Sequence, residues 1–355
     1  MIRLRTLQLI KRHFHSFFRH NTPTKFVNLV HIYYQFWQGS PVVQGYPFEI
    51  IIDPINFCNL RCPLCVTGQH KNRRPYGTMP FEEFTRIIDE MRQWLYKVRF
   101  YSWGEPLLHK DIYRMVSYTH RNNIGTEVST NFHSFSNEDQ DPENLIDSGL
   151  ELLIISLDGT TEKTYMEYRI GGDFRKVLNN LKALTKAKTV KRSHFPVVEI
   201  QFLAMKHNEH EIPDMKKLAK ELGVDRLRIA PLTLNVRDPN QVKEWLPANE
   251  KWSRYDYRTL EDKIYRNRRR CEWLWRSTVI NWDSTISPCC VFEGPKADFG
   301  SLKERSFQKI WNNERYQVSR NVFNKNHKSF TDLKTICERC KGMPLAEDVQ
   351  QHGLY

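Results

Sequence analysis

The chain has 355 residues, a net charge of +13, 40% hydrophobic residues and 27% charged residues. This composition is that of a globular protein with enough apolar material for a core, and the length allows about two domains. No run of about 18 apolar residues occurs that could span a membrane. The start lacks the apolar segment and cleavage site of a secretory signal, so the sequence predicts a cytoplasmic protein.

Residues 1–47 are predicted to form a basic amphipathic helical extension. Leu4, Leu7 and Ile10 recur at helical spacing with Arg and Lys between them. Such a helix can lie on an anionic membrane surface, or it can pack on the body of its own protein and leave its basic face in water. Because the helical pattern alone does not separate these cases, contact of residues 1–40 with the inner face of the membrane stays open.

From residue 48 to residue 230, short β-rich runs alternate with amphipathic stretches. Strands that alternate with helices of this length form βα units around a parallel sheet. Six units are too few for a closed eight-stranded barrel, so we expect an α/β fold, a partial (β/α)6 TIM-like barrel. The strands are expected at 48–53, 97–102, 125–130, 152–157, 197–205 and 225–230, and the helices near 80–95, 111–122, 142–148, 161–187 and 210–221.

The alternating pattern stops near residue 231. Residues 231–270 are irregular and contain three prolines, and we expect them to form a linker. Residues 271–355 are predicted to form a small cysteine-rich α+β domain around the run "STVINWDSTISPCC". In this run Asp283 and Ser284 are expected to make the turn of a hairpin.

The eight cysteines fall into two groups that are about two hundred residues apart. Without a secretory signal, a disulfide framework is not expected, and such clustering suits metal ligation better. The first group is Cys58, Cys62 and Cys65; the second is Cys271, Cys289, Cys290, Cys337 and Cys340.

The first cysteine group has the spacing C-x3-C-x2-C and follows the first predicted strand. In parallel α/β sheets, functional sites collect at this end of the strands. Structural zinc takes four protein ligands, and the nearest fourth candidate is His70. A 4Fe–4S cluster held by three thiolates keeps one iron open for another ligand. The spacing differs from the paired C-x2-C of common zinc sites and favours iron–sulfur over zinc.

Four motifs together resemble the radical S-adenosylmethionine (radical SAM) superfamily over residues 48–230. They are "CNLRCPLC", the "WGEP" at 103–106, the "STN" at 129–131 and the "ISLDG" at 155–159, each at the end of a predicted strand. The resemblance implies a 4Fe–4S cluster on the first cysteine group. It also implies reductive cleavage of S-adenosylmethionine to a 5′-deoxyadenosyl radical, which abstracts hydrogen from a C–H bond.

The resemblance also implies which residues contact S-adenosylmethionine. Gly104, Glu105 and Pro106 would meet the methionyl ammonium, although Glu105 could instead cap a helix. Ser156 and Arg169 would hold the methionyl carboxylate, a natural task for Arg. The remaining expected contacts are Asn131 with the ribose hydroxyls, and Leu203 and Met205 with the adenine.

The tail resembles the SPASM/twitch extension found behind many radical SAM cores. The resemblance implies a second, auxiliary 4Fe–4S cluster, whose ligands would be Cys271, Cys289, Cys337 and Cys340. Full SPASM domains carry seven cysteines; the five here are enough for one cluster with four ligands and one thiol left over. We expect Cys290 to stay unligated, because Cys289 and Cys290 would point to opposite faces of the hairpin strand. The family's hairpin has a Gly in its turn where this chain has Ser284. Read without the core, the tail could equally be a zinc ribbon.

We therefore expect a radical SAM oxidoreductase that oxidises a sugar, a cyclitol or a related small molecule. It would take electrons from an external donor such as flavodoxin or ferredoxin. An alternative is a maturase of a ribosomally made peptide or protein. An alternative of another class, a zinc-stabilised basic nucleic-acid-binding protein, explains the charge but not the βα units. The sequence assigns no catalytic acid or base; Asp283, His207 and Tyr255 are candidates.

Overall fold

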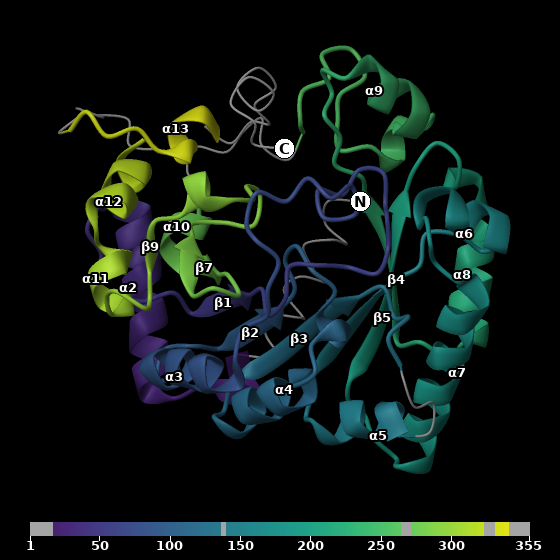
Figure 1. Ribbon diagram of the computed structural model, residues 1–355, viewed down its shortest axis with the longest axis horizontal. Coiled ribbons are helices and arrows are strands. Elements are labelled where there is room, and N and C mark those ends of the chain that lie inside the picture. The colour runs from purple at the N-terminus through teal and green to yellow at the C-terminus, as the bar shows by residue number, and fades with distance from the viewer. Residues whose placement is uncertain (1–16, 136–139, 264–270, 323–330, 341–355) are drawn as a thin grey trace.

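The computed structural model describes residues 17–135, 140–263, 271–322 and 331–340. A single sheet of nine strands in the order β6-β5-β4-β3-β2-β1-β7-β8-β9 runs through the molecule. Figure 1 shows α3, α4, α5, α7 and α8 along the outer side of the strands, with α2, α11 and α12 grouped beyond β1. The sheet is open, with β6 and β9 at its two edges.

The first six strands are parallel and follow one another in the sheet, which confirms the predicted partial barrel. Each of them lies within one or two residues of its expected position, because runs rich in β-branched residues carry a strong local signal. Their bounds are β1 Glu49–Ile52, β2 Lys97–Phe100, β3 Gly125–Thr130, β4 Leu152–Ser156, β5 Val197–Ala204 and β6 Arg226–Pro231.

The connecting helices also follow the sequence pattern, with one exception. The stretch expected as a single helix over 161–187 is two helices, because Gly171 has φ +83°, a backbone conformation that ends a helix. The bounds are α3 Phe81–Met91, η1 Pro106–Leu108, α4 Ile112–Arg121, α5 Gln140–Asp147, α6 Glu162–Tyr168, α7 Phe174–Val190, η2 Glu209–Glu211 and α8 Ile212–Glu221.

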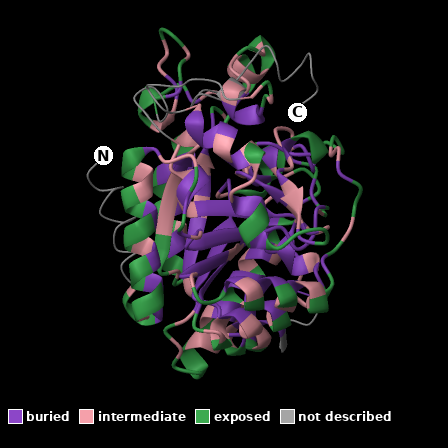
Figure 2. Ribbon diagram, turned by 90° about the vertical axis from the view of Figure 1, so that its left-hand side faces the viewer, coloured by how far each residue is buried: buried purple, intermediate pink, exposed green. Residues whose placement is uncertain are grey.

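The main hydrophobic core lies between the sheet and these helices. Alternate strand residues such as Ile50 and Ile52 point into it, since neighbouring side chains on a strand face opposite ways. Figure 2 accordingly shows buried strands surrounded by helices whose outer faces are exposed. The inner face of β1–β3 is charged instead: Arg99 lies 2.9 Å from Glu49 and 3.8 Å from Glu127. Ion pairing compensates for the burial of these groups.

Residues 231–263 are more ordered than a linker. They contain α9 Pro239–Trp245, η3 Glu250–Trp252 and an antiparallel bridge between Tyr255 and Asp262. Trp245 and Tyr255 are buried in a second apolar cluster that includes Leu60 and Cys62. The segment therefore packs against the loop that carries the first three cysteines.

The tail does not form a separate sheet but continues the barrel sheet. β7 pairs with β1 in parallel, and β8 and β9 follow in antiparallel order. The expected hairpin is present, and its turn residue Ser284 has φ +69°, where the family has Gly. The bounds are α10 Trp273–Arg276, β7 Ser277–Ile280, β8 Thr285–Ser287, η4 Pro295–Ala297, β9 Gly300–Ser301, α11 Phe307–Trp311, α12 Glu314–Asn321 and α13 Ile336–Cys340.

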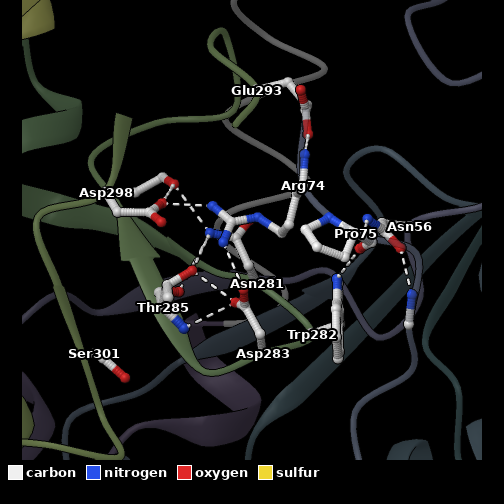
Figure 3. Close-up of polar contacts among 12 residues, drawn as sticks. Asn56, Arg74, Pro75, Asn281, Trp282, Asp283, Thr285, Glu293, Asp298 and Ser301 are labelled. Carbon is white, nitrogen blue, oxygen red and sulfur yellow. Dashed lines mark hydrogen bonds and ion pairs between the residues drawn. The ribbon is translucent and has the colours of Figure 1, made fainter. Parts of the chain in front are cut away.

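Arg74 joins the loop after the three cysteines to the tail (Figure 3). Its guanidinium lies 2.6 Å from Asp283 and 2.6 Å from Asp298, and its own backbone N–H donates to Glu293 at 3.2 Å. Beside it, Trp282 Nε1 donates to the Pro75 carbonyl at 3.1 Å. These contacts tie residues that are more than two hundred positions apart to one another.

Helix α2 Pro23–Gln38 lies in the described part of the predicted N-terminal extension, residues 17–47; residues 1–16 lie outside the described residues. Thr22 caps its first turn by accepting from the N–H of Lys25, and Gly39 ends it with φ +70°. The helix packs against α10 of the tail. Among the described residues, no helix is both long and apolar enough to cross a membrane.

Candidate active site

The loop after β1 presents Cys58, Cys62 and Cys65 at the carboxyl end of the sheet. Cys62 is buried, and Cys58 and Cys65 are half-buried. The N–H of Cys65 donates to the Cys62 carbonyl at 3.1 Å, which makes a tight turn between them. A side chain at Gly68 would come within 2.7 Å of the Cys62 backbone, so this loop folds closely on itself.

Polar N–H groups point at the cysteine sulfurs. The backbone N–H of Leu60 and the Nδ2 of Asn131 lie 3.4 and 3.5 Å from Cys58 Sγ, and Arg169 Nη1 lies 3.8 Å from Cys62 Sγ. Burial, with the Glu105 carboxylate and the thiols of Cys62 and Cys65, raises the pKa of Cys58 to about 12. Bound iron would take the place of the proton on each thiol that it binds.

These residues fit a 4Fe–4S cluster. Three thiols from one turn can each bind a different iron, and N–H donors to the sulfurs are the usual surroundings of such clusters. In the described ranges of the chain, no three His, Cys, Asp or Glu side chains are arranged around a single ion.

The Gly-Glu-Pro motif lies beside this loop, but the Glu105 carboxylate is turned inward. It accepts from the Leu107 N–H at 3.1 Å, from the Thr130 hydroxyl at 2.6 Å and from the Asn131 N–H at 2.7 Å. Glu105 thus caps η1 and fastens the motif to the end of β3. Of the two roles that the sequence left open, the structure shows the cap; the methionyl ammonium would meet backbone carbonyls here.

Gly104 is required where the motif crosses the loop before Cys58. An added Cβ would lie 1.8 Å from the Ile55 carbonyl oxygen, so no other residue fits without a backbone shift. The neighbouring Pro106 is buried as the first residue of η1. Asp53, at the end of β1, accepts from the N–H groups of Trp103 and Gly104 at 3.1 and 3.4 Å. The motif is therefore held by fixed backbone contacts.

Arg169 is held beside the cluster loop by Asp158. Its Nε and Nη2 lie 2.6 and 2.5 Å from Asp158 Oδ2, and this carboxylate is fully buried at the end of β4. Ser156, the last residue of β4, is also buried. Helix α6 ends before the break at Gly171, so Arg169 lies just outside the helix. Its side chain is directed toward Cys62. The Arg169 guanidinium would bind a carboxylate that lies near this thiol.

The expected ribose and adenine contacts also lie near the three thiols. Asn131 Nδ2 donates to Asn59 Oδ1 at 2.7 Å, so its amide is engaged with the cysteine loop in this structure. Met205 is fully buried, and Leu203 packs against the same apolar cluster as Cys58, Cys62 and Cys65. An apolar wall beside the thiols suits the flat face of an adenine.

In the second cysteine group the thiols of Cys289 and Cys290 have different surroundings. Burial raises the pKa of Cys289 first, and the thiols of Cys290, Cys337 and Cys271 raise it further. Around Cys290 the charged neighbours are Arg99 and Glu49 of the barrel interior. Both cysteines lie beyond the end of β8, so strand geometry does not separate them as we had expected. The side chain of Cys340 lies outside the described residues.

Asp53 and Arg74 carry no sequence motif that we recognised, and Asp158 lies in the "ISLDG" motif without having been assigned a role. All three hold the site through contacts to distant backbone or side chains. A charged residue directly after an apolar strand was the available signal for Asp53. The candidate proton acceptors have structural contacts instead: Asp283 pairs with Arg74, and the Tyr255 hydroxyl bonds to the backbone of Leu234. His207 lies edge-on to Trp245.

Comparison with known proteins agrees with this site. A radical SAM superfamily model matches residues 52–219, and a model of the SPASM iron–sulfur cluster-binding domain matches residues 271–341. A tungsten-containing aldehyde ferredoxin oxidoreductase cofactor-modifying protein of Pyrococcus furiosus is 24% identical over 80% of this chain and 87% of its own.

Two further proteins match over different shares of the chain. A PqqA peptide cyclase of Rhodopseudomonas palustris is 28% identical over 52% of this chain and 47% of its own, so about half of that relative is spanned. The crystal structure of Streptococcus suis SuiB bound to the precursor peptide SuiA has the same fold, with a TM-score of 0.58 and 16% identity over 84% of this chain and 72% of SuiB.

The fold and the site define an enzyme that uses iron–sulfur and S-adenosylmethionine. The chain belongs to the radical SAM superfamily and carries a SPASM domain at its C-terminal end. Its cofactors are therefore a 4Fe–4S cluster with S-adenosylmethionine in the core and auxiliary iron–sulfur in the SPASM domain. When bound and reduced, these cofactors would supply a 5′-deoxyadenosyl radical, and the residues described above would orient them.

Proposed function

We propose that this protein is a maturase that removes hydrogen from a residue of a ribosomally made peptide or protein. Two of the similar proteins support a peptide: one is named for the PqqA peptide, and one binds its precursor peptide SuiA. The third is named for modifying the cofactor of an oxidoreductase. The sugar or cyclitol that we expected from the sequence has no comparable support and becomes the second candidate.

The observation that carries this proposal is an exposed apolar rim beside the cysteine loop. Phe57 directly precedes Cys58, and its ring meets Tyr76 edge-on at 6.4 Å. Ile170 follows Arg169, and its carbonyl accepts the N–H of Arg61 at 2.9 Å. All three rim side chains are exposed. Apolar and aromatic groups of this kind suit the side chains of a peptide, whereas sugars are held mainly through polar groups.

The proposed net reaction is a two-electron oxidation of the peptide. The substrate loses one hydrogen atom to the adenosyl radical, and then one electron and one proton. The auxiliary cluster of the SPASM domain would accept this electron and pass it to an external acceptor, while flavodoxin or ferredoxin would supply the electron that starts the reaction. Such a reaction would place the enzyme in the oxidoreductase class that the sequence suggested.

Transfer of deuterium tests the substrate class. An extract of cells grown in deuterated medium is divided by size into a peptide and protein fraction and a low-mass fraction. Each fraction is incubated with the reconstituted enzyme, unlabelled S-adenosylmethionine and dithionite. The deuterium content of the 5′-deoxyadenosine is then measured by mass spectrometry. We expect deuterium in the product with the peptide and protein fraction. Deuterium from the low-mass fraction alone would instead support the sugar or cyclitol.

A variant control separates enzymatic transfer from background cleavage. The combined change Cys58→Ala, Cys62→Ala and Cys65→Ala removes all three proposed ligands of the core cluster. No 5′-deoxyadenosine should form with it from either fraction. Formation at the normal rate would show that another site cleaves S-adenosylmethionine, and the assignment of the three cysteines would then be wrong.

A further inference from the structure

Helix α2 buries polar side chains on the face that it turns to its own protein. Lys25 and Asn28 are both buried. Lys25 Nζ donates to the Asn123 carbonyl at 2.5 Å, and Asn28 bonds to the backbone N–H and carbonyl of Tyr46 at 2.7 and 2.9 Å. Ile32 is the one fully buried apolar side chain of this face. These hydrogen bonds, together with the packing of Leu29, Ile32 and Phe36 on the main core, hold this side of the helix.

The opposite face of α2 is apolar and exposed. Phe26, Val30, Tyr33 and Trp37 recur at the spacing of one helical stripe, with Val27 and Tyr34 beside them; these six side chains are between 48% and 82% exposed. The stripe is about 16 Å long at 1.5 Å per residue. An ordinary surface helix exposes charged and polar side chains instead. This face is therefore suited to contact something other than water.

Along the sequence, the charge before and within α2 has a single sign. The first acidic residue of the chain is Glu49, and six Lys and Arg residues precede it; of these, Lys25 is buried and Arg19 pairs with Glu151. Two copies of this chain that met through α2 would bring like charges together, which disfavours a second copy as the occupant. A surface with fixed negative charge would be attracted, and Trp and Tyr are the side chains that favour the boundary between lipid and water.

We propose that the exposed face of α2 docks on a membrane surface that contains anionic lipid. The helix lies in the plane of the interface, with Phe26, Val30 and Trp37 inserted among the lipid chains and Tyr33 and Tyr34 at the headgroups. The basic residues before it add electrostatic attraction. This docking holds the catalytic domain at the membrane surface. The cysteine loop keeps its place at the carboxyl end of the sheet. This inference is independent of the substrate class.

Vesicle flotation with the full-length, reconstituted protein tests the proposal. Vesicles of phosphatidylcholine alone are compared with vesicles in which a third of the lipid is phosphatidylglycerol, at low and at high salt. We expect binding to the anionic vesicles, weakened by salt. The double variant Val30→Ser/Trp37→Ser should lower the apparent affinity about tenfold or more. The matched control Met166→Ser/Val190→Ser removes two exposed apolar side chains elsewhere and should bind as the unmodified protein does.

Each other result overturns the proposal. No binding to anionic vesicles, or equal binding by Val30→Ser/Trp37→Ser, removes the membrane as the occupant of this face. Equal binding to both kinds of vesicle removes the role of anionic lipid. A dimer in light scattering that becomes a monomer in the double variant assigns the face to a second copy instead. Circular dichroism and iron content must match the unmodified protein, and Trp37→Tyr serves as a milder variant if they do not.

Discussion

The guanidinium of Arg74 lies 2.6 Å from the carboxylate of Asp298, although the two residues are far apart in sequence. Arg74 belongs to the loop that follows the three core cysteines, and Asp298 belongs to the tail between β8 and β9. Arg74 is almost fully buried, so the pair is shielded from water. The position of the tail relative to the core cluster thus depends on a buried charge that the tail must neutralise.

Arg74→Met should lower the free energy of unfolding by about 2–4 kcal/mol, because it leaves Asp283 and Asp298 without their cation. Urea unfolding of the reconstituted protein measures the change. Arg114→Met is the matched control: it breaks the pair with Asp111, in which Arg114 is 62% exposed, and should cost less than about 1 kcal/mol. Equal losses for both variants would contradict the role of Arg74.

Asp53 should make the stability depend on pH. Burial raises the pKa of Asp53 from 3.8 to about 7, although the N–H groups of Trp103 and Gly104 lower it. A carboxyl with a raised pKa binds protons more tightly in the folded state. Its contribution is therefore fully present below pH 3.8 and is lost as the pH rises through about 7.

Asp53→Asn keeps the shape and one acceptor for the Gly104 N–H but carries no charge at any pH. We expect the thermal midpoint of the unmodified protein to fall, relative to that of the variant, as the pH rises from about 4 to about 7, and to level off above that. Thermal unfolding followed by circular dichroism across this range measures the difference. Parallel pH profiles for the two proteins would show that Asp53 does not titrate there.

Arg169→Ala should weaken the binding of S-adenosylmethionine about tenfold or more while the core cluster remains, because no iron ligand is changed. The shift in the electron paramagnetic resonance signal of the reduced cluster on titration reports the affinity. Arg175→Ala removes a nearby charge that is 82% exposed and should leave the affinity unchanged. If Arg169→Ala binds as tightly as Arg175→Ala, the guanidinium does not hold the methionyl carboxylate.

Cys289→Ala should lose the iron of one cluster, whereas Cys290→Ala should keep the iron of both. The reason is that Cys289 lies with the thiols of Cys271 and Cys337, and Cys290 faces the charges of Arg99 and Glu49. Iron and sulfide counts per chain, after the same reconstitution, compare the two variants. The opposite pattern would move the ligand by one position, and full iron in both would assign neither residue to a cluster.

Most of the barrel could be predicted, because its evidence is local. Strand runs such as Glu49–Ile52 contain the residues that favour extended backbone, and the spacing of Cys58, Cys62 and Cys65 is visible in eight letters. The break at Gly171 was missed because the flanking residues continue the helical pattern on both sides. A glycine in a helical pattern is tolerated often enough that it does not by itself mark an end.

The sequence by itself determined the order of the βα units, the grouping of the cysteines and the ends of the strands where the motifs stand. Only the tertiary structure decided where individual side chains point. The Glu105 carboxylate accepts hydrogen bonds from Thr130 and Asn131, and Arg74 pairs with Asp298 of the tail. Phe26, Tyr33 and Trp37 of α2 are exposed. The physical reason is that backbone conformation follows from neighbouring residues, whereas a polar side chain takes the nearest partner in space, and that partner can lie anywhere in the chain.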